Sequence, residues 1–131
     1  PNGESGRYPE GWAFGYGSDY WSEQYQCWVM RAPEINRVTM SHIVSVPNHV
    51  RCWNRELYHQ LRGHNPQLSV ADDYELIVRT CLASQMCHIP EMLYIQHIDP
   101  KSAQRERNAI IQEIVPVIHS LYADALDARF T

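Results

Sequence analysis

The stretch from about Ser102 to Phe130 has the clearest helical pattern in the sequence, and it restricts the possible folds most strongly. Apolar residues recur there at steps of three and four, the spacing that places them on one face of an α-helix. They are Ile111, Ile114, Val115, Ile118, Leu121, Tyr122, Ala125 and Leu126. Pro116 lies inside this pattern, and we expect it to kink or split the helix because proline lacks a backbone N–H. A fold with a long C-terminal helix is therefore expected.

A second helix is expected over about Val70 to Ala83. Ser69, followed three positions later by Asp72, is typical of a capping box at a helix start. Asp72 and Asp73 would fall in the first turn, where free backbone amides and the helix dipole favour negative charge. Two interpretations follow: the acids stabilise the helix start, or one carboxylate, held ionised, acts as a general base. The apolar residues available for burial are Leu76, Ile77 and Leu82.

The remaining segments predict short strands and one short helix. Strands are expected within an aromatic-rich lead-in, at Trp12 to Tyr16 and Cys27 to Arg31, and further on at Val38 to Val46 and Met92 to Ile98. Asn54 is suited to cap a short helix over Arg55 to Leu61, followed by a turn in which Gly63 takes a positive φ. This order of strands and helices predicts an α/β or α+β fold, with a short mixed sheet and the long C-terminal helix.

Composition excludes several classes of protein. The chain has 131 residues, enough for one domain, and a formal net charge of −4 without a basic block. Nucleic acid held mainly through phosphate contacts is therefore not expected as a partner. No apolar run reaches the roughly 20 residues that a membrane helix needs, and no secretory signal is visible. The four cysteines lack a Cys-x-x-Cys pair, so we expect reduced thiols and a cytoplasmic protein.

The order of the segments from Val38 to Phe130 resembles the second half of a family 2 glycosyltransferase with the GT-A nucleotide-diphospho-sugar transferase fold. That family commonly has a strand and a short helix ending in Gly-Gly, then Glu-Asp-x-x-Leu with a downstream arginine, then a strand and a terminal helix. Here Arg62-Gly63-His64-Asn65 occupies the glycine turn, and Asp72-Asp73-Tyr74-Glu75-Leu76-Ile77-Val78-Arg79 occupies the acidic motif. The resemblance implies two segments: an irregular lead-in over 1–37 and a partial GT-A-like domain over 38–131.

The resemblance also implies roles for individual residues. Asp73 stands at the position of the catalytic aspartate, which takes the proton from the acceptor hydroxyl, and Asp72 replaces the usual glutamate. Gly63, His64 and Asn65 would border the acceptor, although His64 and Asn65 suit a structural turn equally well. His97 lies where some members place a metal-binding histidine; alternatively it is simply hydrogen-bonded. Arg79 lies four residues after Glu75, and we expect an ion pair between them rather than a contact that holds Asp72.

The donor-binding half of the family, with its Asp-x-Asp metal motif, has no counterpart in residues 1–37. A divalent metal, Mg²⁺ or Mn²⁺, is therefore expected only in an intact enzyme and not on this chain alone. Two functions remain open. The chain is a glycosyltransferase fragment acting on a nucleotide-sugar donor and a hydroxyl acceptor, or a non-catalytic binding or oligomerisation module. The surface left by the missing half should be apolar, which predicts a homo-oligomer.

Overall fold

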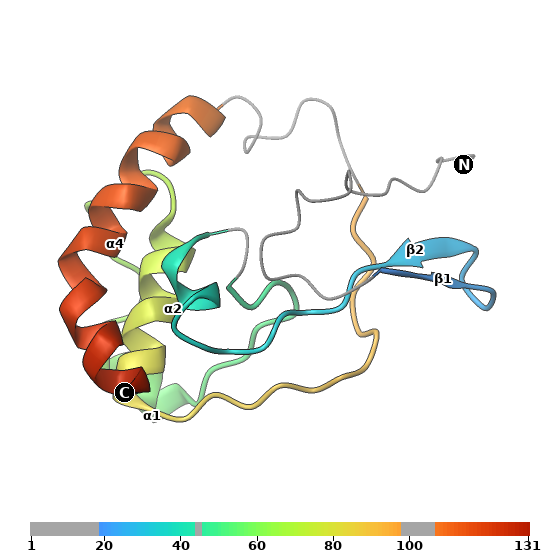
Figure 1. Cartoon of the computed structure of the whole chain (residues 1–131), viewed down its shortest axis with the longest axis horizontal. Helices are drawn as coiled ribbons and strands as arrows, with labels where there is room; N and C mark the ends of the chain where they lie inside the picture. The colour runs from blue at the N-terminus through green and yellow to red at the C-terminus, as the bar shows by residue number, and fades with distance from the viewer. Residues whose placement is uncertain (1–18, 44–45, 98–106) are drawn as a thin grey trace.

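The computed structural model describes residues 19–43, 46–97 and 107–131. In these ranges the chain forms two short strands, one 3₁₀-helix and three α-helices (Figure 1). In chain order they are β1 (Tyr20–Ser22), β2 (Cys27–Val29), η1 (Thr39–Ser41), α1 (Arg55–Gln60), α2 (Asp72–Ala83) and α4 (Asn108–Phe130). A small sheet with separately placed helices is an α+β fold, and the predicted mixed class with a long C-terminal helix is confirmed.

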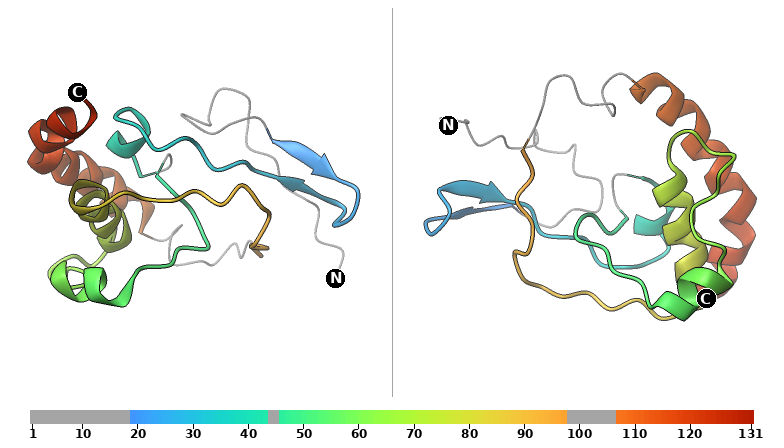
Figure 2. Two further views of the ribbon diagram at one scale, coloured as in Figure 1. Left: turned by 90° about the horizontal axis from the view of Figure 1, so that it is seen from below. Right: turned by 180° about the vertical axis from the view of Figure 1, so that it is seen from behind.

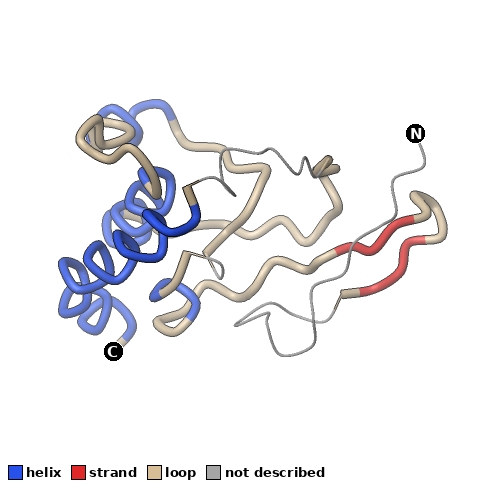
Figure 3. The backbone as a smooth tube through the Cα atoms, turned by 90° about the horizontal axis from the view of Figure 1, so that it is seen from above, coloured by secondary structure: helices blue, strands red, loops and turns tan. Residues whose placement is uncertain are grey.

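Strands β1 and β2 form an antiparallel hairpin that extends away from the helices (Figure 3). Trp21 lies opposite Trp28, and the two rings meet edge-on with centroids 5.7 Å apart. Such a cross-strand aromatic pair stabilises a short hairpin. The strand predicted over Cys27 to Arg31 is confirmed at Cys27–Val29, although the described sheet is antiparallel and not mixed. The strand expected at Trp12 to Tyr16 lies outside the described residues.

The strand predicted over Val38 to Val46 is wrong within the described part of that range, which contains η1 instead. The side-chain Oδ1 of Asn36 accepts the backbone N–H groups of Val38 (2.9 Å) and Thr39 (3.0 Å). A side chain that binds nearby backbone donors stabilises a tight turn in competition with strand pairing. Residues 44 and 45 lie outside the described residues.

The strand predicted over Met92 to Ile98 does not form in its described part, because residues 92–97 belong to neither a helix nor a strand. No backbone–backbone hydrogen bond joins residues 92–97 to another described residue. A β-strand requires a hydrogen-bonded neighbour, so a strand-like sequence without one remains an extended loop. This loop runs from the helices toward the hairpin (Figure 1).

Helix α1 and the turn that follows it were predicted from local residue types, and the structure confirms both. Asn54 caps α1, since its Oδ1 accepts the backbone N–H groups of Glu56 (2.9 Å) and Leu57 (3.1 Å). The chain then reverses through Arg62 and Gly63, which have φ values of 62° and 61°. The left-handed turn therefore forms with arginine at its first position and glycine at its second.

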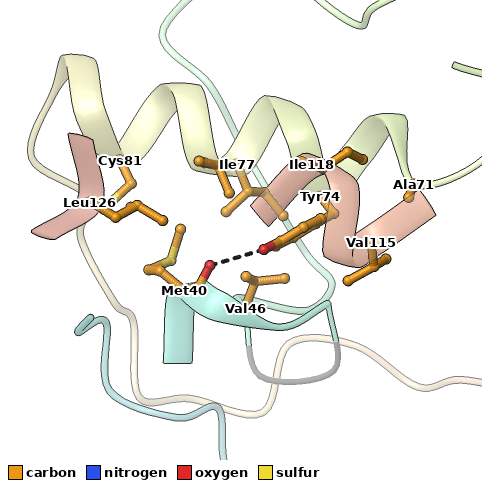
Figure 4. Packing of buried hydrophobic residues seen from close by; sticks show 10 residues of the cluster. Met40, Val46, Ala71, Tyr74, Ile77, Cys81, Val115, Ile118 and Leu126 are labelled. Carbon is orange, nitrogen blue, oxygen red and sulfur yellow. Dashed lines mark hydrogen bonds between the residues drawn. The ribbon is translucent and has the colours of Figure 1, made fainter. Parts of the chain in front are cut away.

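The core lies where α2 packs against α4 and the η1 segment (Figure 4). Tyr74 is fully buried at its centre and donates its hydroxyl to the carbonyl oxygen of Met40 at 3.2 Å. The buried members are Met40, Val46, Ala71, Tyr74, Ile77, Val78, Cys81, Val115, Ile118 and Leu126. The two predicted helices are thus confirmed within the described residues. Residues 102–106 of the expected C-terminal helix lie outside them.

Helix α4 is continuous through Pro116, so the predicted split does not occur. Val115 and Ile118 on either side of the proline are buried in the core, and their packing supports a helix that continues past it. Among the described helices, α4 alone has a length and an apolar composition that would allow it to cross a membrane. That criterion uses length and composition only, and the core helix of a globular domain also meets it.

All four cysteines lie within the described residues and are free, as predicted. Cys81 is buried in α2, and burial raises the pKa of its thiol above the ordinary value, against the opposing effect of the Arg129 charge. The buried Cys81 therefore behaves as a small apolar side chain of the core.

Candidate functional site

The start of α2 carries the two aspartates on which the catalytic hypothesis depends. The helix begins at Asp72, and the preceding Ala71 has a left-handed backbone with φ of 57°. Ala71 occupies the N-cap position and makes no side-chain capping bond, so the prediction that Ser69 caps this helix is wrong. Because of the left-handed backbone at Ala71, the helix begins two positions later than it would with a cap at Ser69. Asp72 and Asp73 nevertheless lie in the first turn, as expected.

Asp73 is held in an ion pair. Its Oδ2 lies 2.7 Å from Nη1 of Arg51, and its Oδ1 accepts the backbone N–H of Tyr74 at 2.8 Å. Arg51 is fixed in turn by donating Nε–H to the carbonyl oxygen of Pro47 at 2.7 Å. Both carboxylate oxygens of Asp73 therefore have partners within its own chain, and the guanidinium occupies one side of the group.

The pKa of Asp73 reflects these contacts. Burial of the carboxyl would raise its pKa, but the hydrogen bond and charge of Arg51, the Tyr74 amide and the charge of His49 together outweigh burial. The net pKa lies below the ordinary aspartate value. Asp73 is therefore ionised at neutral pH, but it is a weaker base than an unpaired aspartate.

A pH-dependent stability follows from the lowered pKa of Asp73. The group contributes stability above the unfolded-state pKa of about 3.9, and this contribution is lost as pH falls through the lower folded-state pKa. We expect Asp73→Asn to remove this part of the acid-induced loss of stability. The measurement is the urea midpoint between about pH 6 and pH 2. Asp124→Asn, on the exposed side of α4, controls for net charge, and identical pH profiles for Asp73→Asn and the wild type would contradict the assignment.

The sequence predicts that the turn residues border a substrate. In the structure, these residues contact α2 or brace the turn itself. Nδ1 of His64 lies 2.8 Å from Oδ2 of Asp72, and both side chains are partly exposed. Oδ1 of Asn65 accepts the backbone N–H of Gln67 at 3.0 Å. At Gly63 a Cβ atom would lie only 2.7 Å from the Tyr58 hydroxyl oxygen, so a side chain does not fit there without movement. These contacts support the structural alternative for His64 and Asn65.

A buried polar network behind the turn was not predicted as a whole. The expected ion pair between Glu75 and Arg79 is confirmed, with Nε–Oε1 at 2.7 Å and Nη2–Oε2 at 2.6 Å. Arg79 also donates to the carbonyl oxygens of Leu61 and Gly63, and so it binds the end of α1. Tyr122 of α4 donates its hydroxyl to Oε1 of Glu75 at 2.6 Å. Burial, with the Glu75 hydrogen bond and charge, raises the pKa of Tyr122 to about 12.

Arg79 therefore has a structural role and does not contact Asp72. Sequence reasoning found the i,i+4 pair because it is local. It missed Tyr122, which is 47 positions from Glu75 in the chain. The one available signal was a carboxylate placed among the buried positions of α2, since a buried charge requires partners.

The described residues do not assemble a metal centre. No group of three or more His, Cys, Asp or Glu side chains in the described ranges could hold a metal ion. His97, the candidate ligand, is exposed in the loop before residue 98. Among the sites expected from sequence, the structure brings together Asp72 and His64 beside the Gly63 turn, pairs Asp73 with Arg51, and leaves His97 apart from both pairs.

Comparison of this chain with protein-family models, with curated proteins and with solved structures found no match.

Proposed function

We propose that this chain is an assembly module that forms homo-oligomers through an exposed side of α4 that flanks its buried side. The observation that carries the proposal is a second apolar stripe on this helix, separate from the one buried in the core. Leu121 is 74% exposed, Val117 58% and Ile110 46%, and Ala128 is exposed on the same side. We call these four residues the outer stripe. Exposed apolar patches of this kind commonly mark protein–protein contacts.

The outer stripe is complementary to itself, which favours a second copy of the chain as its partner. When two α4 helices pack antiparallel about a twofold axis at residue 119, Val117 faces Leu121 of the second copy. Ile110 then faces Ala128, so that a large side chain meets a small one. The spacing of 7, 4 and 7 residues places all four on one helix side. A twofold contact of this kind uses the same surface on both copies.

The variant Leu121→Glu tests the proposal. Leu121 is exposed, so the substitution should leave the fold intact while placing two charges beside the twofold axis. We expect sedimentation equilibrium to show a loss of oligomer, whereas Gln112→Glu retains it. Gln112 is exposed and lies nine residues away, about two and a half turns, on the opposite side of α4. A wild-type chain that remains monomeric at high concentration would refute the proposal.

The glycosyltransferase implied by the resemblance is the second candidate. It is favoured by an ionised Asp73 in the first turn of α2, near the left-handed turn at Gly63. The ion pair with Arg51 weakens this candidate, because a general base must accept a proton from the acceptor hydroxyl. The Asp73→Asn variant also tests this function: in a protein that includes a donor-binding half, it should abolish sugar transfer while the fold persists. Unchanged transfer would exclude Asp73 as the base.

A further inference from the structure

Residues 91–97, with the sequence Glu-Met-Leu-Tyr-Ile-Gln-His, form a strand-like segment without a strand partner among the described residues. We call it the 91–97 segment. Leu93 is 57% exposed, Tyr94 47% and Ile95 58%. Tyr94 and Ile95 are of the aromatic and β-branched types that fit a pleated sheet, and a short continuous apolar run such as 92–95 is consistent with a strand. An exposed segment of this kind presents free backbone donors and acceptors to another chain.

One side of the segment contacts its own chain at two positions. The ring of Tyr94 lies against that of His49, with centroids 5.2 Å apart, and Met92 is half-buried. In an extended chain Met92, Tyr94 and Gln96 share one side, and Glu91, Leu93, Ile95 and His97 share the other. The second set is exposed in every member. The ring contact thus anchors one side of the segment and leaves the other open.

We propose that the 91–97 segment pairs antiparallel with the same segment of a second copy, with the twofold axis at Tyr94. In this register Leu93 lies opposite Ile95 of the second copy, and the two apolar pairs flank the axis. Glu91 lies opposite His97, and Met92 lies opposite Gln96. The pairing supplies backbone partners that the described residues do not provide to either copy, and it forms a two-stranded antiparallel ribbon.

The polar residues at the two ends of the segment favour this register and this partner. Glu91 is its one acidic residue and His97 its one basic residue, and the twofold axis sets them opposite each other at both ends of the ribbon. A parallel pairing would place Glu91 against Glu91, and like charges directly opposite are unfavourable. A shift of the axis by one residue, to Leu93 or to Ile95, would set Glu91 against Ile95 or Leu93 against His97, so that a polar residue faces an apolar one. The segment is therefore self-complementary in one arrangement.

This contact is distinct from the proposed contact through α4. Helix α4 lies at one end of the molecule, while the 91–97 segment lies toward the β1–β2 hairpin, and the views in Figure 1 and Figure 2 agree on this placement. Two twofold contacts on different faces take an assembly beyond a dimer. The strand contact can therefore be tested while the α4 contact is disrupted.

The test is disulfide cross-linking in a chain that carries Cys52→Ser, Cys87→Ser and Leu121→Glu. The first two substitutions remove the exposed native thiols, and the third disrupts the α4 contact. With Met92→Cys and Gln96→Cys together, each cysteine lies opposite its counterpart, within the roughly 7 Å between Cα atoms that a disulfide requires. Diamide takes up the two hydrogens released as each S–S bond forms. We expect a covalent dimer on a non-reducing gel, with Tyr94 and its ring contact intact.

The matched control is Gln96→Cys alone. In the proposed register the two copies of position 96 are offset by four residues, about 14 Å along the strands, so no dimer is expected. Equal cross-linking of the single and double variants would show random collision and would overturn the register. The absence of a cross-link in the double variant would overturn the strand contact, whether or not wild-type protein forms an oligomer through α4.

A charge exchange tests the same register without cysteines. In the Leu121→Glu chain, Glu91→Lys should weaken the dimer about tenfold, because lysine then faces His97. The exchange of both residues, Glu91→His with His97→Glu, should restore the dissociation constant measured by sedimentation. If the exchanged chain dimerises no better than Glu91→Lys, the pairing of these residues is overturned.

Discussion

Replacing Arg79 by methionine is expected to lower the free energy of unfolding by about 3–5 kcal/mol, because it leaves a buried carboxylate without its charge partner. Glu75 is only 5% exposed, and Arg79 is its one cationic partner among the described ion pairs. The substitution also removes the donors to the carbonyl oxygens of Leu61 and Gly63. The measurement is urea unfolding followed by circular dichroism.

Two variants separate the buried charge from the loss of the arginine itself. Adding Glu75→Gln to Arg79→Met removes the unpaired charge while keeping an acceptor for Tyr122, so the double variant should be more stable than Arg79→Met alone. Asp127→Asn breaks the pair of Asp127 with Arg37 at the surface and should cost less than about 1 kcal/mol. A double variant no more stable than the single one would show that the unpaired charge is not the cause.

The features that sequence reasoning found are those decided within a few residues. The Asn54 cap, the positive φ of Gly63 and the pair between Glu75 and Arg79 each depend on neighbours in the chain. Helices α2 and α4 could also be predicted, because their apolar spacing is a local property. The same holds at the candidate site, where the position of Asp73 in the first turn is a local property and could be predicted.

The features that sequence reasoning missed depend on distant partners or on competing local bonds. Arg51 pairs with Asp73 across 22 positions and changes the interpretation of that aspartate from a free base to an ion pair. A strand-like sequence becomes a strand only when another strand binds it, and residues 92–97 have no such neighbour in the described chain. The side chain of Asn36 accepts the backbone N–H of Val38, and this local bond favours a 3₁₀ turn over a strand. The periodic pattern of α4 likewise placed Leu121 on the same helix face as residues that are buried, although Leu121 is largely exposed.

Two leucines of α4 differ in burial, and this difference predicts different effects of their substitution on stability. Leu126 is fully buried between α2 and η1, and Leu126→Ala should lower the free energy of unfolding by about 2–5 kcal/mol through lost burial and the cavity that remains. Leu121→Ala is the matched control, with the same atoms removed from the same helix. Because Leu121 is 74% exposed, the control should change the stability of the monomer by less than about 0.5 kcal/mol.

The same pair of variants distinguishes folding from assembly when unfolding is repeated at several protein concentrations. An oligomer raises apparent stability as concentration rises, because association favours the folded state by mass action. Leu121→Ala should reduce this concentration dependence while leaving the dilute protein unchanged, and Leu126→Ala should lower stability at every concentration. Equal losses for both variants in dilute solution would place Leu121 in the core and would remove the outer stripe as a surface for assembly.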